Sequence, residues 1–310
     1  MTTKNKKAIA AALFLLILFL LTAGCAPEYQ EGEHEATVVV EDYKGRSVEI
    51  PEDPQRIISL SPGNTEIAYA LGLEDRLVGV TDYCNYPPEA EDKTSIGGFQ
   101  DPNMEKIVEM EPELVLAGSM HEDEVFKLED LGISVLALVP ETLEDIFETL
   151  EMVAVATGNT EEYHGLEEDL SDRLDEVKEA VEGIPEEERV RVYYEVYSDP
   201  VMSAGEGSLV HEVVTTAGGL NIFSDIAERY PQVSQEKILE EQPQVILFPD
   251  YHGTADMLAG EMGDRPGWES LPAIEEERIY AVDDDVFARP GPRLIDAVEM
   301  AAEIFYPEYF

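Results

Sequence analysis

The sequence has few basic residues and few cysteines. Its 310 residues hold 20 Lys and Arg against 68 Asp and Glu, a formal net charge of −48. Nucleic acid is excluded as a partner, because binding its phosphates needs clustered Lys and Arg. Two cysteines exclude a disulfide framework and a zinc site of four cysteines. Hydrophobic residues make up 44% of the chain, which excludes wholesale disorder, and the length allows two or three domains.

Common catalytic motifs are also missing. The sequence has no G-x-S-x-G elbow, H-E-x-x-H pair, P-loop or C-x-x-C, and Gly205 and Gly207 lack the third glycine of a dinucleotide fingerprint. No residue pattern nominates a nucleophile and base, so an enzyme is the minor hypothesis. The histidines show no i, i+4 pair, and we interpret them as surface residues rather than zinc ligands; they are His34, His121, His164, His211 and His252.

The N-terminus has the features of an export signal. Three lysines within residues 4–7 precede an apolar run at 8–21, which is shorter than the ~20 residues that span a bilayer. Small residues follow, and then Cys25. This pattern predicts a signal peptide over residues 1–24, and it resembles a lipobox in which Cys25 carries the lipid. The alternative, a free cysteine, is weaker because free cysteines are usually buried.

Residues 25–36 are polar and without periodicity, which predicts a flexible tether. The acids that follow are spread over the whole chain. Such a charge repels itself unless salt screens it. We therefore expect a halophilic, high-salt source, in preference to an acidic surface made for one substrate.

Short apolar runs alternate with helical patterns, which predicts an α/β fold with mostly parallel sheets. The first half offers helices near 64–72, 103–110 and 121–131. Helical patterns give way to strands again after residue 186. The predicted strands are 56–60, 77–80, 113–117 and 134–139 in the first half, and 189–196, 245–250 and 278–282 in the second.

Residues 142–182 contain no strand pattern. An amphipathic helix ends at Gly158, and a second, highly charged helix follows from Thr160 to Gly183 with one apolar stripe. At 1.5 Å per residue it would be ~36 Å long. We expect it to bridge two lobes, although an ordinary surface helix is the alternative. The predicted domains are an N-terminal α/β lobe at 37–158, a bridging helix at 159–184 and a C-terminal α/β lobe at 185–310.

An internal repeat supports two related lobes. Residues 105–116 read EKIVEMEPELVL and residues 236–247 read EKILEEQPQVIL. Each copy predicts a helix, a turn marked by proline and a buried strand. One copy falls in each half of the chain.

The most specific segments are IISLSPGNTEIAYALG at 57–72, VGVTDYCNYPPEA at 78–90 and GGFQDPNMEKIVEMEPELVLA at 97–117. The second half adds MSAGEGSL, YPQVSQEKILEEQPQVILF and FARPGPRLIDA. Together these resemble the solute-binding proteins of ABC importers for iron complexes and vitamin B12, above all the cobalamin-binding members. The resemblance covers about residues 37–305. It implies two α/β lobes joined by one long helix, with the ligand in the cleft between them.

The resemblance also implies roles for single residues. Tyr83 and Phe99 match aromatic contacts to the corrin, and Tyr230 stands where Trp is common. Large aromatic walls suit a broad, mostly apolar disc with amide fringes. The other expected ligand-binding residues are Met202, at another usually aromatic position, and Phe287 and Arg289, near Arg293 in the last cleft loop. For Phe99 and Phe287, core packing is an equal alternative.

Glu105 and Glu236 match the two glutamates that dock onto arginines of the membrane permease. Asn103 and Ser234 look like helix N-caps, so each Glu would lie in a first turn, where an acid also gains ~0.3–1 kcal/mol from the helix dipole. Equivalent carboxylates on two lobes suit a two-fold permease dimer.

The sequence thus predicts an extracytoplasmic protein, not an enzyme, that is lipid-anchored to the outer face of the cell membrane. It would deliver cobalamin or a related corrinoid to an ABC permease dimer with its ATPase. We expect a monomer with no cofactor and no metal. The alternatives are a receptor for ferric siderophore or haem, in which Tyr83 or Tyr230 would ligate iron, and an enzyme on the same scaffold.

Overall fold

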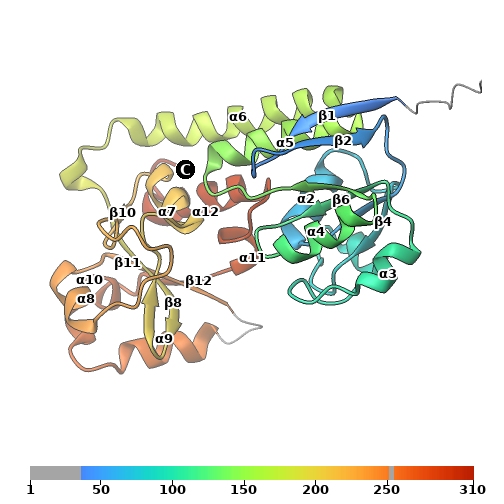
Figure 1. The fold of residues 1–310 in the computed structure, drawn as a ribbon. Coiled ribbons are helices and arrows are strands. Elements are labelled where there is room, and N and C mark those ends of the chain that lie inside the picture. The colour runs from blue at the N-terminus through green and yellow to red at the C-terminus, as the bar shows by residue number, and fades with distance from the viewer. Residues whose placement is uncertain (1–35, 251–254) are drawn as a thin grey trace, which may run out of the picture. The chain divides into compact units, whose positions relative to one another are not determined.

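The computed structural model describes residues 36–250 and 255–310 of the chain (Figure 1). The predicted signal peptide, Cys25 and nearly all of the predicted tether lie outside the described residues. Within the described part, no helix is long and apolar enough to cross a membrane.

The first half of the described chain builds a five-stranded parallel sheet in the order β5-β4-β3-β6-β7. Its inner strands β3 and β6 are buried along their whole length, as expected of a sheet covered on both faces. Neighbouring residues of β3 enter different cores, because Ile57 packs with α2 and α5 and Ile58 packs with α3 and α4. The strands are β3 (Ile57–Ser59), β4 (Leu77–Val80), β5 (Thr94–Ser95), β6 (Leu114–Ala117) and β7 (Ser134–Ala137).

Helices and an antiparallel hairpin surround this sheet. We call the whole set, β1 to α5, the first lobe. The hairpin strands are β1 (Thr37–Glu41) and β2 (Ser47–Pro51), and the helices are α2 (Pro62–Ala70), η1 (Pro88–Asp92), α3 (Met104–Glu109), α4 (Glu122–Asp130) and α5 (Leu143–Thr157).

The second sheet has the order β10-β8-β11-β12 with parallel pairing, and β9 runs antiparallel to β8. Its strands are β8 (Arg191–Ser198), β9 (Val201–Ser203), β10 (Leu220–Asn221), β11 (Val245–Pro249) and β12 (Ile279–Val282). We call β8 to α12 the second lobe. Its helices are α7 (Leu209–Thr216), α8 (Gln235–Glu241), α9 (Ala255–Gly263), η3 (Trp268–Ser270), α10 (Pro272–Glu275), α11 (Asp284–Phe287) and α12 (Leu294–Phe305).

One long helix, α6 (Thr160–Glu182), connects the lobes through η2 (Glu186–Glu188). It packs against α5 of the first lobe and α12 of the second (Figure 1). Its apolar stripe is buried at Leu170, Leu174, Val177 and Val181. Thr142 forms a capping box that starts α5, and Gly158 ends it with φ 77°. The α/β fold with a long connecting helix is confirmed.

The two copies of the repeat fold alike. Each is a short helix, a tight turn and a buried strand: α3 and β6 in the first lobe, α8 and β11 in the second. Both turns use a residue in the left-handed region, Glu111 at φ 47° and Gln242 at φ 50°. Each repeat strand pairs with the strand that opens its sheet, β3 or β8.

Besides one core within each lobe, a third hydrophobic core runs through both lobes. It joins apolar residues of α2 and α5, the stripe of α6, and buried residues of α7 and α12. Residues 37–310 accordingly form one compact unit. The two sheets are parts of one body, and the domain boundaries predicted at 158 and 184 stay a prediction.

Candidate ligand-binding site

A cavity of about 260 Å³ lies between the two lobes. The first lobe contributes the loops that follow β3, β6 and β7, at the carboxyl ends of parallel strands, where α/β sheets usually bind ligands. The second lobe contributes Leu209, Arg229, Tyr230 and the segment 288–290. The first-lobe lining is Ser61–Asn64, Phe99, Gly118–His121 and Leu138–Pro140.

Aromatic rings from both lobes meet at this cavity. Phe99 and Tyr230 line it. Tyr83 lies against Phe99 edge to face, with ring centroids 5.2 Å apart, and 57% of Tyr83 is exposed. The structure therefore brings together three of the predicted aromatic contacts, and they offer wide apolar faces to a ligand.

His121 supports this wall from behind and is 1% exposed, so the interpretation as a surface histidine was wrong for this residue. The backbone N–H of Gly118 donates to its Nδ1 at 2.9 Å. Its Nε2–H then donates to the carbonyl oxygen of Phe99 at 2.5 Å. The ring ties the Phe99 loop to the loop after β6. Sequence alone gave no signal for this, because His121 and Phe99 are 22 residues apart.

Two predicted contacts lie elsewhere. Phe287 is fully buried in the core shared by the lobes, so the prediction of a ligand contact there is wrong: α11 turns this side chain inward. Met202 is half-buried on β9, forms a bridge with Gln232, and is not part of the cavity lining.

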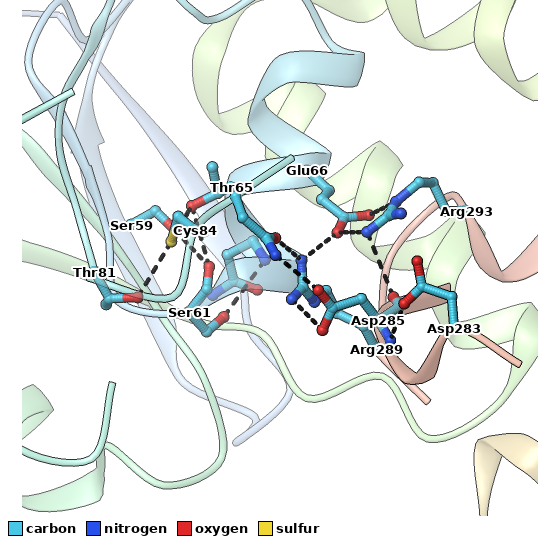
Figure 2. Close-up of polar contacts among 12 residues, drawn as sticks. Ser59, Ser61, Thr65, Glu66, Thr81, Cys84, Asp283, Asp285, Arg289 and Arg293 are labelled. Atoms are coloured by element: carbon cyan, nitrogen blue, oxygen red, sulfur yellow. Dashed lines mark hydrogen bonds and ion pairs between the residues drawn. The ribbon is translucent and has the colours of Figure 1, made fainter. Parts of the chain in front are cut away.

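Arg289 lines the cavity, but its guanidinium is already engaged (Figure 2). Nη1 donates to Glu66 Oε1 at 2.9 Å and to Asn85 Oδ1 at 2.9 Å. Nη2 pairs with Asp285 Oδ1 at 2.5 Å. Arg289 therefore joins the lobes, since Glu66 and Asn85 belong to the first and Asp285 to the second.

Arg293 binds the same carboxylate from the other side. Its Nε and Nη2 donate to the two Glu66 oxygens at 2.9 and 2.6 Å. Its guanidinium also stacks on the Tyr86 ring, 3.9 Å from the centroid. Burial lowers the pKa of Arg293, but the hydrogen bond and charge of Glu66 more than offset this and raise it. Both arginines stay charged and paired.

Arg229, which also lines the cavity, pairs with Glu141 of the first lobe at 2.5 Å. Both side chains are exposed, at 47% and 57%. Among the described residues that line the cavity, Arg229 and Arg289 are the only lysines or arginines. Each already has a carboxylate partner, so the cavity presents no unpaired guanidinium or ammonium group.

A family model described as "Periplasmic binding protein" matches residues 57–286, most of the chain and both lobes. The chain belongs to the periplasmic binding protein family. An uncharacterized ABC transporter substrate-binding lipoprotein of Bacillus subtilis, YvrC, is 32% identical over 99% of both chains. The vitamin B12-binding protein of Vibrio cholerae is 35% identical over 80% of this chain and 88% of its own.

A solved structure shows the same fold. The crystal structure of the periplasmic vitamin B12-binding protein BtuF of Vibrio cholerae aligns with a TM-score of 0.72 and 32% sequence identity. The alignment covers 83% of this chain and 98% of that one. The shared fold accounts for the mostly parallel sheets.

Outside the cavity, this periplasmic binding protein presents two equivalent carboxylates. Glu105 and Glu236 are exposed in the first turns of α3 and α8. Asn103 and Ser234 cap these helices by accepting from the backbone N–H of the third helical residue, as the sequence predicts. Within residues 36–250 and 255–310, no three His, Cys, Asp or Glu side chains gather as a metal site.

Proposed function

We propose that this protein is the extracytoplasmic solute-binding component of an ABC importer, which captures cobalamin or a related corrinoid and delivers it to a permease dimer with its ATPase. It acts as a monomer held to the outer face of the membrane by lipid on Cys25, and it performs no catalysis. The B12-binding relatives support the ligand class.

One observation carries the choice of ligand: aromatic rings line a cavity whose arginines are already paired. An anionic ferric siderophore needs converging unpaired cations, and Arg229, Arg289 and Arg293 are each held by Glu141 or Glu66. A corrin needs instead apolar walls and hydrogen bonds to its amide groups, and backbone groups can supply those hydrogen bonds.

The size of the cavity sets how the ligand lies. Ligand pockets commonly measure ~300–1,000 Å³, and this one encloses about 260 Å³. A corrin therefore extends past the enclosed volume and covers the exposed ring of Tyr83. Such a position of the corrin would give a role to the 57% exposed ring of Tyr83 beside the cavity.

Haem ligation by Tyr230 is disfavoured. Burial raises the pKa of this phenol; the charge of Arg229 opposes this in part, and the nearby Asp284 carboxylate adds a smaller increase. Iron ligation by tyrosine uses the phenolate form. The structure makes that form harder to reach, whereas a neutral ring can stack on a corrin.

Titration calorimetry with cyanocobalamin tests the proposal. We expect binding near 1:1 that depends on the aromatic walls, with Tyr230→Ala weakening it by about tenfold, since a good aromatic contact contributes roughly 0.5–1.5 kcal/mol beyond its buried area. Parallel titrations use haem and a ferric siderophore. No heat with cyanocobalamin beside tight binding of either iron complex rejects the corrinoid.

Docking of the permease is proposed for Glu105 and Glu236. Replacing both by Ala removes a charge-assisted contact on each lobe, so transport falls while ligand affinity stays within about twofold. Charge reversal to Arg lowers transport further than Ala. Glu109 and Glu240 are exposed on the same helices and serve as matched controls. Loss of ligand binding with docking intact contradicts this placement.

A further inference from the structure

The contact between the lobes beside the cavity is built around one buried carboxylate. Glu66 on α2 has 2% of its side chain exposed and accepts three hydrogen bonds, one from Arg289 and two from Arg293. Figure 2 shows it between the two guanidinium groups. We call Glu66, Arg289 and Arg293, together with Asn85 and Asp285, the clamp.

The clamp is balanced in charge and closed by hydrogen bonds. Two carboxylates, Glu66 and Asp285, face two guanidinium groups. Asn85 completes the ring, because its Oδ1 accepts from Arg289 and its Nδ2 donates to Asp285 Oδ2 at 2.8 Å. A buried ion pair holds its geometry when its remaining donors and acceptors are satisfied in this way.

Backbones also touch at this point. A Cβ on Gly63 would clash with the carbonyl oxygen of Pro290, and one on Gly291 would lie 3.2 Å from Glu66 Oε2. The start of α2 and the segment before α12 therefore meet with no space left between them. The side chains of the clamp and this close backbone contact together fix the separation of the two segments.

The same two segments also line the cavity, residues 61–64 from the first lobe and 288–290 from the second. We propose that Glu66 is a positioning residue: by holding Arg289 and Arg293 it sets the spacing of the lobes, and so the width of the cleft, before a ligand arrives. The effect on ligand affinity rests on the proposed function, while the effect on lobe spacing does not.

A second buried carboxylate offers a matched control. Glu195 on β8 is 3% exposed and binds Arg265 through Nη1 and Nη2, at 2.5 and 2.7 Å, and also accepts from the Tyr193 hydroxyl at 2.9 Å. All three residues belong to the second lobe. Glu195→Gln therefore weakens a buried pair of the same kind without touching the contact between lobes.

Pulsed EPR on the full chain separates the two roles. Spin labels are attached to Glu109→Cys and Glu275→Cys, which are exposed positions in opposite lobes. Cys25→Ser removes one native thiol that would otherwise be labelled. The other native cysteine, Cys84, is only 3% exposed and is therefore protected from the label. Glu66→Gln and Glu195→Gln both lower the melting temperature. We expect only Glu66→Gln to shift or broaden the distance distribution of the ligand-free protein. Arg289→Lys keeps the positive charge but loses the forked guanidinium donors, so we expect a smaller change in the distance distribution. This variant replaces Glu66→Gln in the experiment if Glu66→Gln does not fold.

Affinity provides the second readout. If Glu66→Gln leaves about a tenth of the molecules with the native spacing, the apparent Kd for cyanocobalamin rises about tenfold, while Glu195→Gln stays within about twofold. An unchanged distance distribution in Glu66→Gln, or equal broadening in Glu195→Gln, overturns the inference. A wild-type protein that binds no cyanocobalamin rejects the proposed ligand, and the distances still decide the role of Glu66.

Discussion

Two ionic contacts join the lobes beside the cavity, and they differ in burial rather than in distance. Glu66 has 2% of its side chain exposed and its arginines 11% and 13%. Arg229 and Glu141 are 47% and 57% exposed, although their 2.5 Å separation is no longer than those of the clamp. Water and salt weaken the exposed pair, whereas the clamp works in a low dielectric and leaves costly charges if one partner is lost.

The comparison teaches which contact a highly acidic protein can rely on. At 1 M salt the Debye length is ~3 Å, so exposed pairs lose most of their attraction while buried pairs keep theirs. A formal charge of −48 repels itself most strongly at low salt. Burial of the clamp should therefore keep the lobes joined at low salt and at high salt alike.

The largest effect is expected from Glu66→Ala. It leaves two buried guanidinium groups without their main partner, and breaking a buried pair in this way costs ~3–5 kcal/mol. A melting curve should show a decrease of about 10 °C, at roughly 2–4 °C per kcal/mol for a chain of this size. A decrease as small as that of Glu141→Ala would erase the distinction between the two contacts.

The second largest effect is expected in how the two contacts respond to salt. For the wild type we expect the melting temperature to rise steeply from near-zero to molar KCl as self-repulsion is screened. The deficit of Glu141→Gln should vanish at 1 M KCl, whereas that of Glu66→Gln should remain. Calorimetry on all three proteins across the salt series measures this. Equal salt dependence of both deficits contradicts the assignment.

A smaller effect concerns Asp284, next to the clamp. Burial raises the pKa of this carboxyl, and the adjacent Asp285 adds to the shift. A raised folded pKa means that this group favours the folded state below its unfolded pKa and loses that contribution as pH rises. Asp284→Asn should therefore raise the melting temperature at pH 7 by a few degrees at most, with a difference that shrinks toward pH 4. An increase that is constant with pH would assign the effect to packing.

The smallest effect is expected at the exposed contact. Arg229→Ala should change the free energy of unfolding by less than about 1 kcal/mol, the usual limit for exposed pairs. Urea denaturation can measure a free-energy difference of this size. Arg56→Ala is not a suitable control, because the Arg56 side chain donates hydrogen bonds to backbone carbonyl groups. Lys44→Ala, at another exposed position, is the better reference. A loss near that of Glu66→Ala would show that exposure does not weaken the pair.

Much of the fold follows from local patterns. The strands at 77–80, 114–117 and 245–249 and the helices around Gly158 are short-range features, fixed by apolar runs and caps. The pattern of apolar runs in the sequence did not predict the hairpin of β1 and β2. It also gave no hint that the last helix, α12, would complete a core shared by both lobes.

The candidate site was harder to predict for a physical reason. Tyr83 and Tyr230 stand out because large rings occur in polar, proline-rich turns, and Phe99 was indicated only by the family resemblance. Glu66 sits in an ordinary helical pattern, and its partners lie 223 and 227 positions away. Phe287 and Arg289 are two residues apart, yet a short helix sends one to the core and the other to the cavity. Such choices depend on tertiary packing.

The position of α12 near the end of the chain imposes an order on synthesis. A chain that emerges N-terminus first can form the first sheet once residue 137 is available. The shared core, however, waits for residues 294–305, and the clamp waits for Arg289 and Arg293. A ribosome stopped before residue 289 would hold a chain with every described strand and an incomplete cleft. The cleft between the lobes can therefore be completed only near the end of synthesis.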